Sequence, residues 1–550
     1  MVTDQLAELI DRALRSAAAD GVVEGSWNIS LERPKRPEHG DWSTNVALAL
    51  SGRDRKPRAV AEALVQRLPP SEMVQRVEVA GPGFVNFYLS RAWLHDIVRR
   101  AGDASVPFGR SDVGQGSHVN VEYVSANPTG PASVVTGRQA AVGDTIANLL
   151  EATGHRVTRE YYINDAGRQI TLFGRSLEAH YLRVFGVEAD LPEEGYRGDY
   201  IRDLAHEMAR EIGDELMSAP EDERVERLQR LGLDRMLARI ETSLARFGTR
   251  FDRWFSEREM NERGGVKNAL ARLEAEGLTY ERDGAVWFAA TRFGDDKDRV
   301  VIRSDGTPTY LASDAAYMLD KIERSFDRLV YLLGPDHHGT LARMFALAQA
   351  FGYGRERVEF PIVQKMTILR GGATLKASKR AGVVVLLDEL VEDVGNDAAR
   401  YTFLSRSIDA PLEFDIETIR LQTPENPVFY TQYAHARISS ILRRAEEQGH
   451  TPAFTETDLE RLEHPSEEHL MRKLAAYEET VPTAAELRAP QRITRYVEEL
   501  ASDFSAFYRD CRVISDDEGL TRARLALCVA TRRVIADALG LLGVGAPDRM

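Results

Sequence analysis

A strand, a helix and a second strand follow one another over residues 118–165, and this pattern constrains the fold more than any other feature of the sequence. HVNVEYVS and RVTREYYIND are rich in β-branched and aromatic residues, and TGRQAAVGDTIANLLEAT between them has a helical pattern that Gly154 ends. Two strands joined by a helix form a βαβ unit and pair in parallel. The chain is therefore expected to contain an α/β domain with a doubly wound sheet.

Length and pattern divide the chain into three expected domains. At 550 residues it is too long for one hydrophobic core. Residues 1–110 alternate helical and strand patterns and predict a small α/β domain. Residues 111–395 carry the doubly wound sheet, and charged helical segments over 167–275 predict a helical insertion or crossover. Residues 396–550 are almost wholly helical in pattern, which predicts an all-α bundle.

Composition excludes membrane-spanning and disulfide-rich classes. No apolar run approaches the roughly 20 residues that span a bilayer, and the N-terminal helix pattern lacks the apolar stretch of a signal peptide. We therefore expect a cytoplasmic protein without a membrane partner. Cys511 and Cys528 are the two cysteines, too few for a four-cysteine zinc site or a disulfide framework, so no zinc is expected.

Charge limits the nucleic-acid partners. The net charge of −15 argues against a protein that coats DNA or RNA, because phosphate binding needs clustered Lys and Arg. Two local segments around HGDWSTN are nevertheless basic, LERPKRPEHG at 31–40 and SGRDRKPRAV at 51–60. They predict a local nucleic-acid contact, and solvated surface loops are the alternative.

Polar residues at the ends of two expected strands mark a ligand site. In a doubly wound sheet the ligand lies at the carboxyl ends of the strands, at the switch point. Glu122, Ser125 and Asn127 follow the first strand, and the segment GPDHHG at 334–339 follows a later one. The glycines and the helix start beyond them favour a phosphate or ribose contact. A metal site at the two histidines is the weaker alternative, because no other ligand stands at metal spacing nearby.

Two further segments carry candidate groups. Tyr310 and Asp314 are four residues apart and share a face if their segment is helical, which also suits an ordinary helix-surface pair. The loop LKASKR places Lys376 and Lys379 on either side of Ser378. Mobile lysines of this kind can follow a polyphosphate leaving group, and a basic surface loop is the alternative.

Taken together, these segments resemble those of arginyl-tRNA synthetases, which are class I aminoacyl-tRNA synthetases. The segments are HGDWSTN, AGPGFVNFYL, VEYVSANPTGP, YYINDAGRQI, SDGTPTYLASDAAY, GPDHHG, ASKRAG, NPVFYTQYAHARI and LGLLGVGAPDRM, and they extend over nearly the whole chain. The resemblance implies an N-terminal domain that contacts the tRNA elbow, a Rossmann-type catalytic domain, and a C-terminal helical domain that reads the anticodon. It also implies a monomer that uses ATP, with Mg²⁺, to attach L-arginine to tRNA(Arg).

The resemblance implies roles for single residues. Arginine would be held through its amino group and backbone by Glu122, Ser125 and Asn127, and through its guanidinium by Tyr310 and Asp314. The implied ATP contacts are Gly334, Asp336, His337, His338, Gly339 and Arg138. The implied catalytic positions are Ser133, Thr136, Lys376, Ser378 and Lys379. The expected tRNA contacts are Trp42, Asn45, Tyr430, Tyr433 and Arg437, with a core position as the alternative for the two tyrosines.

The turn after VSANPTGP departs from the family signature. The family has two histidines around a glycine, His-x-Gly-His, where this chain has Ser133, Val135 and Thr136. Serine and threonine are shorter, uncharged donors, and the loss of one preorganised donor typically costs roughly 10²- to 10³-fold in rate. Val135 would also occupy space that the glycine leaves for adenine. In the second signature, Ala377 replaces the usual Met or Leu.

Three interpretations of function follow from this combination. The first is an arginine–tRNA ligase whose ATP site is divergent. The second is a paralogue that binds arginine, tRNA or both, with impaired or absent adenylate formation. The third is a transferase that uses ready-made arginyl-tRNA, which would also explain the lost ATP contacts.

Overall fold

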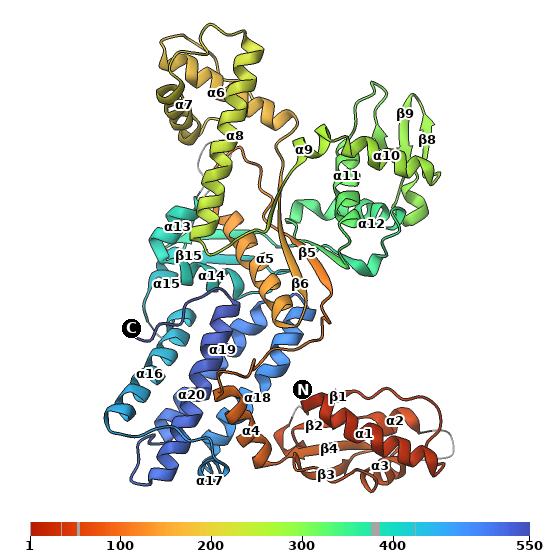
Figure 1. Cartoon of the computed structure of the whole chain (residues 1–550), viewed down its shortest axis with the longest axis vertical. Helices are drawn as coiled ribbons and strands as arrows, with labels where there is room; N and C mark the ends of the chain where they lie inside the picture. Colours follow the sequence, from red (N-terminus) through yellow and green to blue (C-terminus); the bar gives the residue numbers. More distant parts are fainter. Residues whose placement is uncertain (1, 35, 52–55, 376–384, 424) are drawn as a thin grey trace.

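The computed structural model describes residues 2–34, 36–51, 56–375, 385–423 and 425–550. In Figure 1 a central sheet carries two lobes above it and a helical bundle below it, and the N-terminal domain lies beside the lower part of the bundle. Within these residues, no helix is both long enough and apolar enough to cross a membrane.

The N-terminal domain is a four-stranded antiparallel sheet in the order β1-β2-β4-β3, with helices packed on it. Leu6, Leu14 and Leu64 of the helices share one core with Phe87 of the sheet. The elements are α1 (Val2–Ala19), β1 (Leu31–Glu32), the 3-10 helix η1 (Pro37–His39), β2 (Trp42–Thr44), α2 (Val46–Leu50), α3 (Pro57–Val65), β3 (Val74–Ala80) and β4 (Phe84–Leu89).

The central sheet is parallel throughout and has the order β12-β11-β5-β6-β7. Its strands are β5 (His118–Glu122), β6 (Arg156–Ile163), β7 (Arg253–Ser256), β11 (Arg328–Tyr331) and β12 (Val358–Glu359), and α5 (Val134–Ala152) joins β5 to β6. The predicted βαβ unit is therefore confirmed. The chain adds β6 and β7 on one side of β5 and then β11 and β12 on the other, so the switch point lies between β5 and β11.

Register places one row of side chains across four strands of this sheet. Tyr331 pairs with Glu122, Glu122 with Glu160, and Glu160 with Arg253. Residues paired across a sheet project from the same face. Three ionisable groups and a tyrosine thus lie side by side at the carboxyl half of the sheet.

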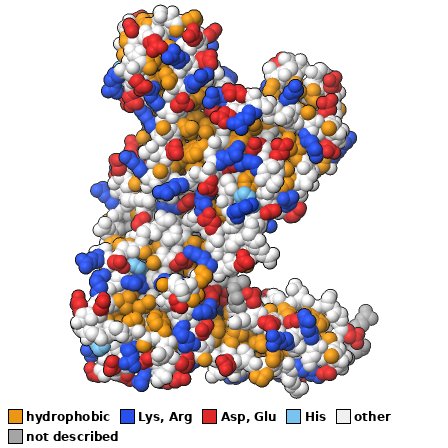
Figure 2. Space-filling view, in the orientation of Figure 1, with side chains coloured by type: hydrophobic (Ala, Val, Ile, Leu, Met, Phe, Trp, Pro, Cys, Tyr) orange, Lys and Arg blue, Asp and Glu red, His pale blue; other side chains and the backbone are white. Residues whose placement is uncertain are grey.

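Two lobes stand above the sheet. The helical lobe contains α6 (Arg168–Val184), α7 (Asp199–Ile212) and α8 (Glu221–Arg246). The mixed lobe contains α9 (Glu257–Glu262), α10 (Gly265–Ala275), β8 (Thr279–Arg282), β9 (Ala285–Phe288), η2 (Ala290–Phe293), β10 (Arg299–Ile302), α11 (Tyr310–Glu323), η3 (Pro335–Thr340), α12 (Leu341–Ala350) and η4 (Arg355–Arg357). In Figure 2 the lobes stand apart, and side chains of both charges line the hollow between them.

The helical insertion that we expected over 167–275 is shorter in the structure. Its uninterrupted helical part ends at Arg246, because β7 then returns to the central sheet beside β6. The remaining residues, α9 and α10, pack in the mixed lobe against α11. The segment is thus two structural units separated by an edge strand.

The C-terminal part is mainly helical, as predicted. A small three-stranded sheet accompanies the first helices. Its strands β13 (Met366–Arg370) and β14 (Ala373–Thr374) come before α13 (Leu387–Val394) and α14 (Asn396–Leu404), and its strand β15 (Leu412–Asp415) lies between α14 and α15 (Ile416–Arg420). The bundle then consists of α16 (Pro427–Glu447), α17 (Glu456–Leu459), α18 (Pro465–Glu486), α19 (Gln491–Asp510) and α20 (Glu518–Leu541). Cys528 is buried within α20, and Cys511 is buried directly after α19.

Helix α4 (Arg91–Gly102) packs on the bundle rather than on the N-terminal sheet. Its buried Leu94, Ile97 and Val98 belong to the core that α18 and α20 share. We expected the first domain to extend to residue 110. The N-terminal fold instead ends with β4 at Leu89, and α4 is part of the main body.

Candidate active site

The start of α5 is held by its own side chains. Ser133 is the N-cap residue, and its hydroxyl accepts a hydrogen bond from the Thr136 amide at 3.4 Å, while the Thr136 hydroxyl accepts one from the Ser133 amide at 3.3 Å. The two hydroxyl oxygens are also 3.2 Å apart. This reciprocal arrangement is a capping box. The two side chains expected to donate to phosphate are therefore engaged with the helix start.

Val135 lies between these two residues and points outward. Its side chain is 56% exposed, so it covers the surface of the first helical turn without packing into the core. Next to it, the Val134 amide donates to the carbonyl of Val385 at 3.1 Å. The backbone at Val385 thus covers part of the first turn of α5.

Arg138 does not contact the expected ATP site, which corrects its assignment. Its guanidinium is buried and donates to four backbone carbonyls, those of Gln364, Lys365, Ser407 and Ala410, at 2.7 to 3.4 Å. Burial lowers the pKa of Arg138 to about 10. The side chain thus fastens α5 to the segments that flank β13 and β15.

The backbone at the end of β5 has an unusual shape. Val124 and Ser125 have φ angles of 69° and 41°, in the left-handed region that β-branched residues rarely adopt. Such conformations cost of order 1–3 kcal/mol each and cluster at functional sites. Here they turn Ser125 back toward the sheet, where its hydroxyl donates to Glu122 Oε1 at 3.1 Å and accepts from the Tyr162 amide at 3.1 Å.

Glu122 ends β5 and is almost fully buried. Its Oε2 atom lies 2.6 Å from the Nζ atom of Lys321 on α11. The ammonium also lies over the rings of Tyr317 and Tyr331, 4.4 and 3.8 Å from their centroids. Sequence patterns gave no reason to select Lys321, because one lysine in a helical segment ordinarily reads as a surface residue.

Three carboxylates converge above the carboxyl end of β5. Burial raises the pKa of Asp314 to about 6, the carboxylates of Glu257 and Glu122 add to the rise, and the Arg343 guanidinium opposes it. Burial also raises the pKa of Glu257. The carboxylates come from β5, α9 and α11, and their mutual repulsion favours the binding of a cation among them. We call Glu122, Glu257 and Asp314 the acidic pocket.

The other residues assigned to arginine lie at the edge of this pocket. Tyr310 is the first residue of α11, one turn before Asp314, and its side chain is 73% exposed. The shared helix face that we expected for this pair is present. Asn127 is exposed, and its amide donates to Gln169 Oε1 on α6 at 2.6 Å.

The GPDHHG segment forms the 3-10 helix η3 after β11, and α12 begins at Leu341. Asp336, His337, His338 and Gly339 are exposed, and a Cβ atom on Gly334 would lie 3.7 Å from the Gln139 amide of α5. The segment therefore lies beside α5, as a site at the switch point requires. Among the described residues no group of three or more His, Cys, Asp or Glu is placed to hold a metal ion. Lys376, Ser378 and Lys379 lie outside the described residues.

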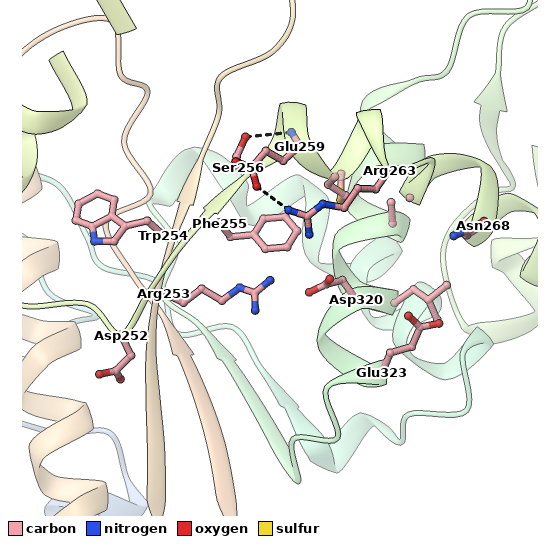
Figure 3. Close-up of a pocket in the computed structure, with 14 residues that line it drawn as sticks. Asp252, Arg253, Trp254, Phe255, Ser256, Glu259, Arg263, Asn268, Asp320 and Glu323 are labelled. Atoms are coloured by element: carbon pink, nitrogen blue, oxygen red, sulfur yellow. Dashed lines mark hydrogen bonds and ion pairs between the residues drawn. The ribbon is translucent and has the colours of Figure 1, made fainter. Parts of the chain in front are cut away.

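A second hollow lies on the far side of β7. Its volume is about 450 Å³, and β7, α9, α10 and α11 surround it. Figure 3 shows Arg253 extending toward Asp320 inside it, while Arg263 is paired with Glu259 at the rim. The residues assigned to arginine and ATP lie elsewhere, so this hollow is separate from the acidic pocket.

The residues expected to contact tRNA differ in how exposed they are. Trp42 is only 5% exposed and packs in the N-terminal core, which corrects its assignment as a contact residue. Asn45 is exposed at the start of α2. Tyr430 is half-buried, and its hydroxyl bonds to Ser505 at 3.2 Å.

The exposed Tyr433 and the half-buried Arg437 lie together at the surface of the bundle. The Arg437 guanidinium lies 4.6 Å from the ring centroid of Tyr433 and 5.3 Å from that of Tyr508 on α19. Tyr433 also stacks on Phe429, with centroids 6.1 Å apart. Sequence spacing on α16 indicated two members of this group, and folding adds Tyr508 from a distant segment.

A parallel sheet with clustered polar residues at its switch point, followed by a helical bundle, matches the architecture of the class I aminoacyl-tRNA synthetases. Models of three domains match the chain in order: the arginyl tRNA synthetase N terminal domain at residues 4–89, the catalytic domain of class I (R) tRNA synthetases at 109–405, and the DALR anticodon binding domain at 431–550. The chain belongs to the arginyl-tRNA synthetase family.

Relatives with this family name match the chain from end to end. The arginine–tRNA ligase of Moorella thermoacetica is 46% identical over 99% of this chain and 98% of its own length. That of Desulforamulus reducens is 43% identical over 100% of both chains. The structure of Thermus thermophilus arginyl-tRNA synthetase superposes with a TM-score of 0.77 at 25% identity and covers 100% of both chains. Mycobacterium tuberculosis methionyl-tRNA synthetase shares the fold over 78% of this chain and 91% of its own, with a TM-score of 0.54 at 13% identity.

Proposed function

We propose that the protein is an arginine–tRNA ligase that activates L-arginine with ATP and attaches it to tRNA(Arg). The observation that carries this proposal is the acidic pocket at the end of β5. A guanidinium is a planar cation that pairs with carboxylates in a forked geometry, which the ammonium of lysine lacks. Membership in the arginyl-tRNA synthetase family supports the same assignment.

The proposed reaction has two steps. A carboxylate oxygen of arginine attacks the α-phosphorus of ATP, the bond from that phosphorus to the bridging oxygen breaks, and pyrophosphate leaves. A hydroxyl of the terminal tRNA ribose then attacks the carbonyl carbon of the adenylate, and AMP leaves. We assign the α-amino group and backbone of arginine to Glu122, Ser125 and Asn127, and its guanidinium to Asp314 and Tyr310.

ATP is assigned to the space between the start of α5 and η3. A helix start favours an anion, and the segment Gly334–Gly339 offers backbone and imidazole donors. Mg²⁺ would accompany the phosphates. By the family resemblance, Lys376, Ser378 and Lys379 would follow the pyrophosphate as it leaves.

tRNA is assigned to two surfaces of a monomeric protein. One is the N-terminal domain, with Asn45 and the basic segments near it. The other is the surface group of Tyr433, Arg437 and Tyr508, because aromatic rings and a guanidinium form platforms on which bases stack.

The capping box favours a second candidate function. The hydroxyl oxygens of Ser133 and Thr136 accept from backbone amides of the helix start, which holds both side chains there and leaves only short, uncharged O–H donors for phosphate. The protein would then bind arginine and tRNA without forming an adenylate. Such a protein would act as a sensor or carrier, or as a transferase that uses ready-made arginyl-tRNA.

Arginine-dependent exchange between ATP and radioactive pyrophosphate distinguishes the two candidates. The assay is run with and without tRNA(Arg), with lysine replacing arginine as the matched control. We expect exchange with arginine alone among these amino acids. Arginine and tRNA binding without exchange under either condition would favour the second candidate, and equal exchange with lysine would contradict both.

A further inference from the structure

We infer that Lys321 is a positioning residue for arginine: its buried ammonium fixes the Glu122 carboxylate in the orientation in which that carboxylate would receive the α-ammonium of the amino acid. The inference rests on the proposed function, because it concerns how that same pocket accepts its amino acid. It concerns a residue that touches Glu122 and not the substrate.

The geometry gives Lys321 one principal partner. Its side chain is 0% exposed, and its Nζ atom lies 2.6 Å from Glu122 Oε2. The rings of Tyr317 and Tyr331 enclose the ammonium on other sides. Ser125 holds the second carboxylate oxygen at 3.1 Å. The Glu122 carboxylate is thus fixed at both oxygens before any ligand binds.

The neighbouring carboxylate, Glu160, has a separate cation. Arg324 donates to its two oxygens at 2.6 and 2.9 Å, and the Tyr317 hydroxyl donates to one of them at 2.8 Å. Although burial opposes it, Lys321 and Arg324 lower the pKa of Glu160 to about 2. Arg324 is hydrogen-bonded to Glu160 and Lys321 is hydrogen-bonded to Glu122, so each carboxylate has its own direct cationic partner.

Charge explains why Glu122 needs this partner. The charged and titratable groups that act on it are Lys321, Asp314 and Tyr317 from α11, Tyr331 from β11 and, beside it in the sheet, Glu160 from β6. Burial lowers the pKa of Lys321, and Glu122 and Glu160 oppose that shift. Without the ammonium, the Glu122 carboxylate would lose its 2.6 Å ion pair and would be held only by Ser125, so it would be free to turn away from the α-ammonium of arginine.

The test measures arginine binding by calorimetry at pH 7 for the full-length protein and for Lys321→Met, which keeps length and removes charge. We expect K321M to bind arginine about 10- to 100-fold more weakly, the range of coupling between contacting charges. Lys321→Arg, which keeps a positive charge beside Glu122, should recover part of that affinity. Lys267→Met, which removes an exposed lysine on α10, is the control and should bind as the wild type does.

Glu122→Gln and the double variant E122Q/K321M complete the test and apply even if K321M alone does not fold. If Lys321 acts through Glu122, the double variant should bind arginine as E122Q does. A double variant that binds distinctly more weakly than E122Q would overturn the inference, as would K321M with the affinity of the wild type. A wild-type protein that binds no arginine would instead overturn the proposed function, and the inference with it.

Discussion

Asp314 and Glu122 lie in one pocket but in opposite electrostatic surroundings. Glu122 has an ammonium within 2.6 Å, whereas burial, together with the carboxylates of Glu257 and Glu122, raises the pKa of Asp314 to about 6 against the opposing charge of Arg343. One carboxylate is therefore compensated before ligand binding, and the other gains from the arrival of a cation. A preorganised negative charge of this kind strengthens the binding of a cationic ligand and lowers the stability of the protein without that ligand.

Arginine binding should weaken as the pH falls through 6. Asp314 is protonated below its raised pKa of about 6, and a neutral carboxyl attracts a guanidinium weakly. The affinity should fall by up to about tenfold per pH unit below this value. Calorimetry with arginine from pH 5 to 8 measures the effect. Asp314→Asn should bind weakly with little pH dependence, and Glu323→Gln on the exposed part of α11 is the control. An unchanged affinity down to pH 5 would remove Asp314 from the guanidinium contact.

The same substitution should stabilise the empty protein at neutral pH. A carboxyl whose folded pKa is raised binds protons more tightly when folded, so stability is lost as the pH rises from about 4 to 6. Asp314→Asn avoids this loss and should add about 1 to 3 kcal/mol at pH 8, but little at pH 4. Thermal unfolding without arginine at both values is the measurement. A lower midpoint than that of the wild type at pH 8 would contradict the expectation.

At the scale of elements, sequence patterns predicted the position of helix α5 but not the contacts of its side chains. Its range, its place in a βαβ unit and the parallel pairing of its strands follow from local periodicity. Arg138 was misassigned because an arginine beside a phosphate signature suggests an anion contact, and only tertiary packing brings the four carbonyls around it. Strand β7 was overlooked because its four residues lie between charged helical segments.

Restoring the family signature at the start of α5 should raise adenylate formation. The variant combines Ser133→His, Val135→Gly and Thr136→His, which opens the capping box and returns two imidazole donors. Each restored donor typically contributes roughly 10²- to 10³-fold, and single reversions should do little because the groups act as a unit. Tests use pyrophosphate exchange with tRNA present.

Ser133→Ala is the matched control for that variant, because it breaks the cap without adding a donor. It should lower stability by about 0.5–2 kcal/mol and leave exchange no faster. If the unmodified protein already charges tRNA with arginine at roughly 1 to 10³ per second, the expected impairment is wrong. The first turn would then be a complete ATP site built around Val135.

At the scale of the whole molecule, the boundary of the N-terminal domain differs from the one that the sequence pattern predicts. A break in pattern near residue 110 suggested the end of the first domain, yet α4 belongs to the bundle core. Amphipathic periodicity shows that a helix has an apolar face but does not say which domain that face covers. A truncation at the predicted boundary would therefore remove a core helix from the body.

Deleting residues 2–89, and keeping α4, should weaken tRNA binding and flatten its salt dependence. The removed domain carries the basic segments at 31–40 and 51–60, and each lost phosphate contact lowers the slope of log affinity against log salt by about 0.7 to 0.9. Filter binding from 50 to 300 mM salt measures the slope, and arginine binding serves as the control for an intact body. An unchanged slope would exclude the N-terminal domain from the interface.

The packing of α4 and two ion pairs hold the N-terminal domain close to the bundle. Arg33 pairs with Glu479 at 2.9 Å, and Asp41 pairs with Arg472, both partners lying on α18. The span between the two proposed tRNA contacts is consequently set before any tRNA arrives. Because the separation of the two contacts is fixed, binding an RNA of matching dimensions costs little conformational entropy. An RNA whose arms are spaced differently would reach only one of the two contacts, so the protein would select by shape without contacting any base.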